Sequence, residues 1–134
     1  MYRFLLAIGI GLAIVWSSGC SGPPPKGLPP ATSVKGTINM DGKPVPAGEI
    51  HFGMLGVPPR ALKITDGTFS GEAPIGNNQV EVYIYVEGPA NPRYPDVPTK
   101  INTVPKKYWG ATTTLKATVD ASGQKEFHFD ITSK

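Results

Sequence analysis

Apolar and polar residues alternate in short blocks along most of the chain. In residues 33–40, for example, Val34, Ile38 and Met40 lie on one side of the alternation and Lys35 and Asn39 on the other. A period of two is typical of a strand with one buried face. The pattern predicts seven strands, at residues 33–40, 49–54, 61–65, 68–73, 79–86, 115–119 and 126–131.

The same alternation predicts which side chains form the core. Tight turns are expected at Asp41-Gly42 and Asp66-Gly67, because glycine accepts positive φ and aspartate can bond nearby backbone amides. The inward side chains are expected to be Val34, Ile38, Met40, Ile50, Phe52, Met54, Leu62, Ile64, Phe69, Val80, Val82, Ile84, Val86, Phe127, Phe129 and Ile131.

No segment shows the apolar spacing of an amphipathic helix. Glycine and proline are frequent, with 16 and 15 residues, and Pro89, Pro92, Pro95 and Pro98 fall within residues 87–104. We expect this segment to be an irregular loop, either functional or disordered. The predicted fold is all-β, a seven-stranded antiparallel Greek-key β-sandwich formed by residues 33–134.

The N-terminal sequence predicts an export signal. The apolar run 4–16 follows Arg3, as in a secretory signal peptide spanning residues 1–19. Ser18 and Gly19 precede Cys20, the only cysteine, and the string resembles a bacterial lipobox, although Ser17 stands where leucine is usual. We predict lipidation at Cys20. The alternative is an ordinary signal peptide that leaves a free exported thiol.

An anchored chain would carry its domain on a stalk. Residues 20–32 contain the acylated cysteine and a proline-rich linker, which favours extended polyproline II. The expected partner is the membrane, through the lipid. Ser21, in place of the aspartate that retains some lipoproteins at the inner membrane, favours the outer membrane, with the domain facing the periplasm or the surface. The net charge of +3 comes from scattered lysines, which disfavours nucleic-acid binding.

Catalytic and metal motifs are missing from the sequence pattern. His51 and His128 could bind a metal with Glu49 or Glu126 if their strands were adjacent. Neither histidine belongs to an HExxH helix, and no GxSxG elbow occurs. We therefore expect two solvent-exposed strand histidines, and predict no catalytic residue, metal or cofactor.

Aromatic and basic residues near the long loop are the candidate binding surface. Aromatic rings beside cations can stack on sugars or contact protein partners. Alternatively, Tyr108 and Trp109 cap one end of the sandwich. Tyr83 and Tyr85 form a second outward pair, either a platform or cross-strand packing. The candidate ligand-binding residues are Arg93, Tyr94, Lys106, Lys107, Tyr108 and Trp109.

Several strings resemble a known family. They are VKGTINMDGKPVPAGEIHF at 34–52, ITDGTF at 64–69, APIGNNQVEVYI at 73–84 and VPKKYWGATTTLKATVDASGQKEFHFDI at 104–131. Together they resemble the small transthyretin-like, carboxypeptidase-regulatory-like lipoproteins of planctomycetal bacteria. The resemblance implies an exported, lipid-anchored, prealbumin-like sandwich without catalytic residues. The predicted role is structural or in protein interaction, and the alternative is a module that binds carbohydrate or another envelope polymer.

Overall fold

The computed structural model describes residues 27–123 and 125–134. The predicted signal peptide at residues 1–19, Cys20 and linker residues 21–26 lie outside the described residues. Strand β1 begins at Ala31, two residues earlier than the sequence pattern predicts.

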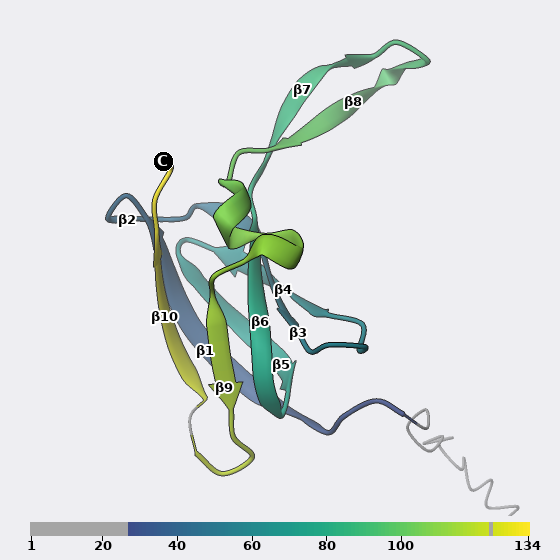
Figure 1. Cartoon of the computed structure of the whole chain (residues 1–134). Coiled ribbons are helices and arrows are strands. Elements are labelled where there is room, and N and C mark those ends of the chain that lie inside the picture. The colour runs from purple at the N-terminus through teal and green to yellow at the C-terminus, as the bar shows by residue number, and fades with distance from the viewer. Residues whose placement is uncertain (1–26, 124) are drawn as a thin grey trace, which may run out of the picture.

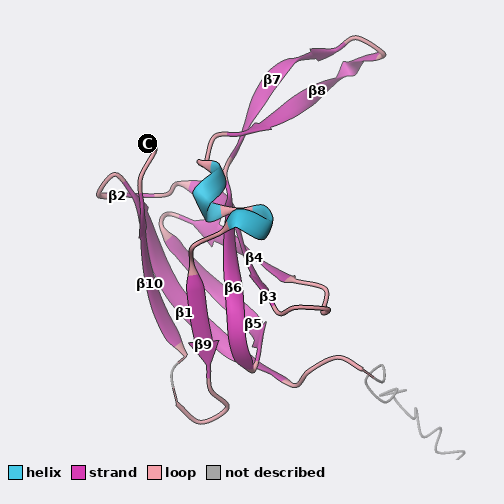
Figure 2. Cartoon of the chain, in the orientation of Figure 1, coloured by secondary structure: helices cyan, strands magenta, loops and turns pink. Residues whose placement is uncertain are grey.

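Strands dominate the described chain, as Figures 1 and 2 show. The prediction of an all-β domain is therefore confirmed. The elements are β1 (Ala31–Met40), β2 (Lys43–Pro44), β3 (Ala47–Gly53), β4 (Arg60–Thr65), β5 (Thr68–Pro74), β6 (Gly76–Tyr83), β7 (Tyr85–Asn91), β8 (Tyr94–Asn102), the short 3₁₀ helices η1 (Lys106–Tyr108) and η2 (Gly110–Thr112), β9 (Lys116–Val119) and β10 (Glu126–Ile131).

The main sheet curls on itself in a sandwich-like arrangement. Its strand order is β10-β1-β5-β4-β3-β6-β9, with β2 paired to β1. Strands β4 and β5 share only the pairs Ile64–Phe69 and Thr65–Thr68, next to their connecting turn, so the sheet can bend there. This bend brings β10, at one end of the order, onto β3, because Phe127 of β10 lies 5.9 Å from Phe52 between ring centroids.

One pairing differs from the antiparallel prediction. Strands β1 and β10 run parallel, with Lys35 opposite Glu126 and Met40 opposite Ile131. Alternation specifies which face of a strand is buried, but it carries no information about the direction of the neighbouring strand. The sequence pattern therefore could not predict this pairing.

The core forms where the alternation places it. Phe52 is fully buried and its ring contacts those of Phe69 and Phe129 at centroid distances of 6.0 Å and 6.4 Å. Val86, which the pattern assigned to the core, is instead 46% exposed. The buried apolar residues are Val34, Ile38, Val45, Ile50, Phe52, Leu62, Ile64, Phe69, Ala73, Val80, Val82, Val104, Tyr108, Ala117, Val119, Phe127, Phe129 and Ile131.

Both Asp-Gly turns have the expected geometry. Asp41 and Gly42 have φ of 51° and 77°, and Asp66 and Gly67 have φ of 50° and 73°. Two successive residues with positive φ characterise the type I′ turn, whose twist matches that of paired strands. These turns join β1 to β2 and β4 to β5.

Residues 87–104, predicted to be an irregular loop, instead form most of a β-hairpin. The predicted strand 79–86 ends early, at Tyr83, and the chain continues into β7 and β8, which pair with each other and with no other strand of the described residues. Figure 1 shows this hairpin projecting from the domain. Each strand of a two-stranded ribbon has a free edge, where the missing amide of a proline breaks no ladder bond. The prolines therefore permit the hairpin that they seemed to exclude.

Polar contacts hold the root of the hairpin. The side-chain oxygen of Asn102 accepts hydrogen bonds from the backbone amides of Ile84 and Val104 at 3.1 Å and 3.2 Å. The backbone amide of Thr103 donates to the carbonyl of Ile84 at 2.9 Å. The hairpin therefore leaves the domain at a fixed point.

Between residues 27 and 134, leaving out residue 124, no helix has the length and apolar character needed to span a bilayer.

Candidate functional site

Near the hairpin, the outward face of β4, β3 and β6 carries acidic, basic and aromatic side chains. Antiparallel register places Glu49 between Lys63 on one side and Tyr83 on the other. Two residues farther along β3, on the same face, His51 lies opposite Glu81. Side chains at directly opposed positions lie close enough to interact, so these strands assemble acidic, basic and aromatic groups from distant parts of the sequence.

Four rings form a connected group on this face. Tyr83 is its centre, with ring centroids 4.8 Å from His51, 6.1 Å from Trp109 and 6.0 Å from Tyr85. The rings of Tyr83 and Tyr85 are nearly parallel, at 13°. Tyr85 is 46% exposed, at the rim of the group. The predicted tyrosine pair thus combines the two alternatives, since Tyr83 packs and Tyr85 presents its ring to solvent.

Hydrogen bonds fix the supporting residues. The hydroxyl of Tyr83 donates to a carboxylate oxygen of Glu81 at 2.5 Å, and His51 Nε2 lies 3.1 Å from Glu49 Oε2. Burial, reinforced by the hydrogen bond to Glu81, raises the pKa of Tyr83 to about 12. Tyr83 therefore remains neutral at physiological pH and serves as a packing support.

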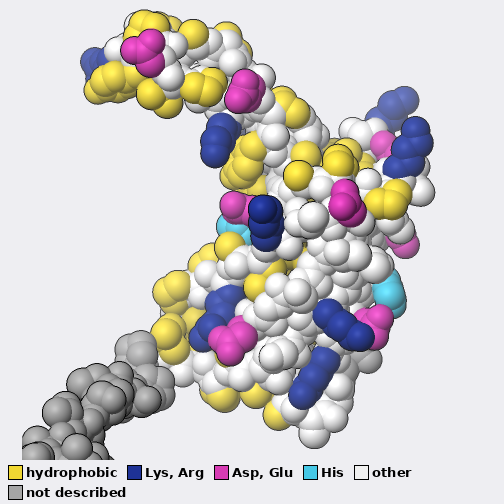
Figure 3. Space-filling model, turned by 180° about the vertical axis from the view of Figure 1, so that it is seen from behind, with side chains coloured by type: hydrophobic (Ala, Val, Ile, Leu, Met, Phe, Trp, Pro, Cys, Tyr) yellow, Lys and Arg dark blue, Asp and Glu magenta, His cyan; other side chains and the backbone are white. Residues whose placement is uncertain are grey.

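A shallow groove runs beside the exposed ring. Its volume is about 360 Å³, near the lower end of the range of ligand sites. Viewed from behind, Figure 3 shows the hairpin projecting beside a hollowed flank that carries histidine, acidic and basic side chains. The groove is lined by Ala47, Gly48, Glu49, Ala61, Leu62, Lys63 and Tyr85.

The six predicted ligand-binding residues do not form one cluster. Arg93 and Tyr94 lie at the tip of the hairpin, where Tyr94 is 60% exposed. Residues 106–109 lie in and after η1, beyond the other end of β8. The sequence pattern placed both groups around one loop, and the intervening strand separates them.

Lys107 and Tyr108 hold the C-terminal segment. Lys107 Nζ donates to Thr132 Oγ1 at 3.2 Å and to the Lys134 carbonyl at 2.6 Å, and the Thr132 amide donates to the Tyr108 hydroxyl at 3.2 Å. Hydrogen bonding to Thr132 lowers the pKa of Tyr108. Through these hydrogen bonds both residues hold the C-terminal segment in place.

Trp109 also faces the domain. Its indole nitrogen donates to the backbone carbonyl of Val104 at 2.7 Å, and its ring packs against the core. The neighbouring Lys106 is exposed. The alternative in which Tyr108 and Trp109 cover one end of the sandwich therefore agrees with their contacts.

The two histidines lie on separate strands that are not neighbours. His51 belongs to β3 and His128 to β10, and three strands separate these in the sheet order. His128 is exposed and bonds through Nδ1 to Thr37 Oγ1 at 2.8 Å, whereas the side chain of His51 is only 21% exposed. The condition for a shared metal site, adjacent strands, is not met. Within residues 27–123 and 125–134, no group of three or more His, Cys, Asp or Glu side chains could hold a metal ion.

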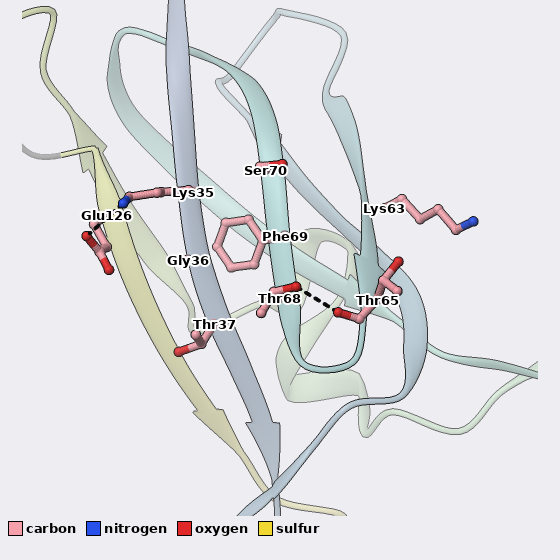
Figure 4. A pocket seen from close by; sticks show the side chains of 9 residues that line it. All are labelled: Lys35, Gly36, Thr37, Lys63, Thr65, Thr68, Phe69, Ser70 and Glu126. Carbon is pink, nitrogen blue, oxygen red and sulfur yellow. Dashed lines mark hydrogen bonds and ion pairs between the residues drawn. The ribbon is translucent and has the colours of Figure 1, made fainter.

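A second groove lies on the outward side of β1, β5 and β4 (Figure 4). Figure 4 shows Lys35 extending toward Glu126, with which it pairs at 3.6 Å, and Lys63 extending away from the groove. The hydroxyl of Thr68 donates to the Thr65 carbonyl at 2.8 Å. The one aromatic residue lining this groove, Phe69, is only 3% exposed. It therefore offers a ligand no exposed ring.

Sequence reasoning missed Glu49, Lys63, Ala47 and Ala61 as neighbours of Tyr85. The alternation did place Glu49, Lys63 and Ala61 outward, whereas Ala47 lay outside the predicted strand 49–54. The register that aligns these residues is a property of the folded sheet. No family model matches the chain, and no significant match exists to a curated protein or a solved structure.

Proposed function

We propose that this protein is a noncatalytic, lipid-anchored β-sandwich of the cell envelope with a structural or protein-interaction role. In this proposal the strands follow the prealbumin-like Greek-key path of the small transthyretin-like lipoproteins of planctomycetal bacteria. The protein is exported by its signal peptide, anchored through Cys20 and spaced from the membrane by the proline-rich linker. The outer membrane is the proposed location.

The observation that best supports this proposal is the position of the hairpin. Ala31 pairs with Pro74, and the amide of Ile75 donates to the Pro30 carbonyl at 2.8 Å, so the described chain starts beside the first residue of β6. The hairpin starts just after the last residue of β6. An eight-residue strand spans roughly 27 Å. An anchor that precedes residue 27 would therefore direct the hairpin away from the membrane (Figure 1).

The hairpin has the surface of an interaction element. Exposed fractions are 46% for Val86, 60% for Tyr94, 58% for Val97 and 49% for Ile101. Among residues 27–123 and 125–134, its two strands pair with no strand but each other, so each also has an edge that could pair with a strand of another protein. In the proposed function, the anchor and linker supply the position and the hairpin supplies the contact.

The proposed anchor follows from the sequence. A single myristoyl chain holds a protein at a membrane only marginally, whereas two signals hold it stably. A bacterial lipoprotein carries three chains on its N-terminal cysteine, which would keep the protein at the membrane. Acylation would also remove the free thiol that an oxidising compartment would otherwise pair.

The test is the intact mass of the protein from the membrane fraction of its native cells, beside a Cys20→Ala variant. We expect a mass for residues 20–134 plus acyl chains, and we expect the variant to appear as unprocessed precursor or to leave the membrane. An unmodified soluble chain that begins near Cys20 would contradict the proposal.

A second candidate function is binding of carbohydrate or another envelope polymer. The predicted aromatic and basic cluster does not assemble, but one observation favours this function at another place. Tyr85 presents a supported ring beside the groove that contains Glu49 and Lys63.

A further inference from the structure

We infer that the groove beside Tyr85 binds a neutral polysaccharide, with a sugar ring on the exposed face of Tyr85 and sugar hydroxyls bonded to Glu49 and Lys63. This inference rests on the second candidate function, and it holds whether or not Cys20 is acylated. The intact-mass experiment and the binding experiment below therefore fail independently.

Tyr85 has the properties of a stacking platform. Nearly half of the residue is exposed, at 46%, while the ring stacks at 6.0 Å on Tyr83. Tyr83 is itself held by Glu81 and packs against His51 and Trp109. Asn102 pairs with Tyr85 across the hairpin and fixes the adjacent backbone. A ring held in this way loses little conformational entropy when a ligand stacks on it.

The polar groups beside the ring suit sugar hydroxyls. Glu49 offers a carboxylate that only accepts hydrogen bonds and Lys63 an ammonium group that only donates them, and the two residues are directly opposed in register. The Glu49 side chain is 52% exposed. Within the described residues Lys63 makes no ion pair. A hydroxyl, which both donates and accepts, can bond to Lys63 and to Glu49 Oε1, since Glu49 Oε2 already lies 3.1 Å from His51 Nε2.

The charges also indicate a neutral ligand. One acidic and one basic residue line the groove, so their fields oppose each other at short range. A polyanion would be attracted by Lys63 and repelled by Glu49. A neutral glycan avoids that repulsion and still satisfies both groups.

The floor of the groove leaves room for a chain. Ala47 and Ala61 are exposed and have short side chains, and they lie on either side of the Glu49–Lys63 pair along the strands, so neither blocks the groove beside that pair. The groove is open to solvent instead of closed into a cavity. An open groove admits an internal segment of a polymer, not merely its end, which fits a polysaccharide better than a free monosaccharide.

The test is a titration of the full chain, extracted from membranes in detergent, with cellohexaose and with the hexamer of N-acetylglucosamine. Binding is followed by calorimetry and by tyrosine fluorescence. We expect saturable binding of at least one of these neutral probes. Absence of saturable binding of both at about 10 mM, a concentration that corresponds to a very weak complex, would overturn the inference.

Three tyrosine variants locate the site. Tyr85→Ala should weaken binding roughly tenfold, the effect of removing an aromatic anchor, and Tyr85→Phe should retain binding because the ring remains. Tyr94→Ala is the matched control, since that tyrosine is exposed at the hairpin tip, and it should bind like the native chain. Equal binding by Tyr85→Ala and native protein, with thermal unfolding unchanged, would overturn the inference.

Two further measurements test the polar pair and the charge preference. Glu49→Gln and Lys63→Met should each weaken binding about threefold to tenfold, the net value of one ordinary hydrogen bond at a solvent-exposed site. Polygalacturonate should bind more weakly than the neutral probes. Tighter binding of this polyanion, or full affinity in both polar variants, would show that the groove is not a neutral-glycan site.

Discussion

The curled sheet and the β7–β8 hairpin both contain antiparallel strand pairs, but they differ in what stabilises them. In the sheet, Phe52 is fully buried among three other phenylalanine rings. In the hairpin, Val97 and Ile101 are 58% and 49% exposed. Burial stabilises by about 25 cal/mol per Å² of apolar surface. The sheet therefore supplies the stability of the domain, and the hairpin depends on the sheet for its position.

This difference indicates how the molecule separates folding from contact. A two-stranded hairpin is marginally stable by itself in water, and this one is fixed to the sheet by Asn102 and Thr103 at its root. Its exposed apolar residues are not required by the core. They are therefore available for a partner, as the proposed function requires.

The largest effect is expected from the centre of the core. Phe52→Ala should lower the free energy of unfolding by about 3–5 kcal/mol, because it removes buried contacts and leaves a cavity. The matched change in the hairpin, Val97→Ala, should stay within about 0.5 kcal/mol. Urea denaturation followed by circular dichroism measures both. Similar losses in the two variants would contradict the division between sheet and hairpin.

Replacing a glycine should also destabilise the protein more in the sheet than in the hairpin, with smaller losses of unfolding free energy than at Phe52. In β1, a Cβ at Gly36 would collide with the Phe127 carbonyl oxygen and the Phe69 ring, so Gly36→Ala should cost about 1–3 kcal/mol through overpacking. In β7, a Cβ at Gly88 would meet the Ile101 side chain, which is 49% exposed and can move, and Thr99 Oγ1, which would lose its 2.7 Å hydrogen bond to the Pro89 carbonyl near the surface. Gly88→Ala should therefore cost less than about 1 kcal/mol. The two denaturation midpoints, measured side by side, decide this prediction.

Removal of the hairpin should have a still smaller effect on the rest of the domain. Replacing residues 86–101 by Asn-Gly keeps the Tyr85–Asn102 pair and closes it with a favoured two-residue turn. We expect the free energy of unfolding to change by less than about 1 kcal/mol, because the loop becomes shorter and little apolar surface is lost. Loss of a cooperative transition in urea would show instead that the hairpin is part of the folding unit.

The last prediction concerns Tyr83, whose ionisation changes stability only at alkaline pH and leaves it unchanged at neutral pH. Its pKa is raised from 10.0 to about 12 in the folded protein. Well below pH 10 the folded and unfolded states are both protonated, and its contribution is fully present. Between pH 10 and 12 the unfolded chain ionises first, so stability falls through this window. The fall should be steeper in the native chain than in Tyr83→Phe, measured as denaturation midpoints against pH, and identical profiles would contradict the assigned pKa.

Prediction from sequence succeeded where local pattern is sufficient. Alternation located Phe52, Phe69 and Phe129 in the core, and the two Asp-Gly pairs formed the expected turns. The prediction was wrong at Val86, because the alternation continues through this residue whereas strand β6 of the main sheet ends at Tyr83. It also failed at residues 87–104, because proline frequency does not distinguish a loop from a ribbon with two free edges.

The candidate site shows the same limit. Alternation indicated that Tyr83 and Tyr85 face outward, but it could not place Lys63 beside Glu49, because register between strands depends on the whole sheet. Proximity in sequence misled for Tyr94 and Trp109, since an extended strand separates residues that a compact loop would have brought together.

The amino-acid sequence alone determined the all-β class, the inward face of most strands and the position of the tight turns, because side-chain period and backbone φ preference are local properties. The tertiary structure decided the parallel pairing of β1 with β10, the projection of the hairpin and the groove beside Tyr85. Each of these depends on contacts between residues far apart in the chain, whose free energy is settled only when the whole core has formed.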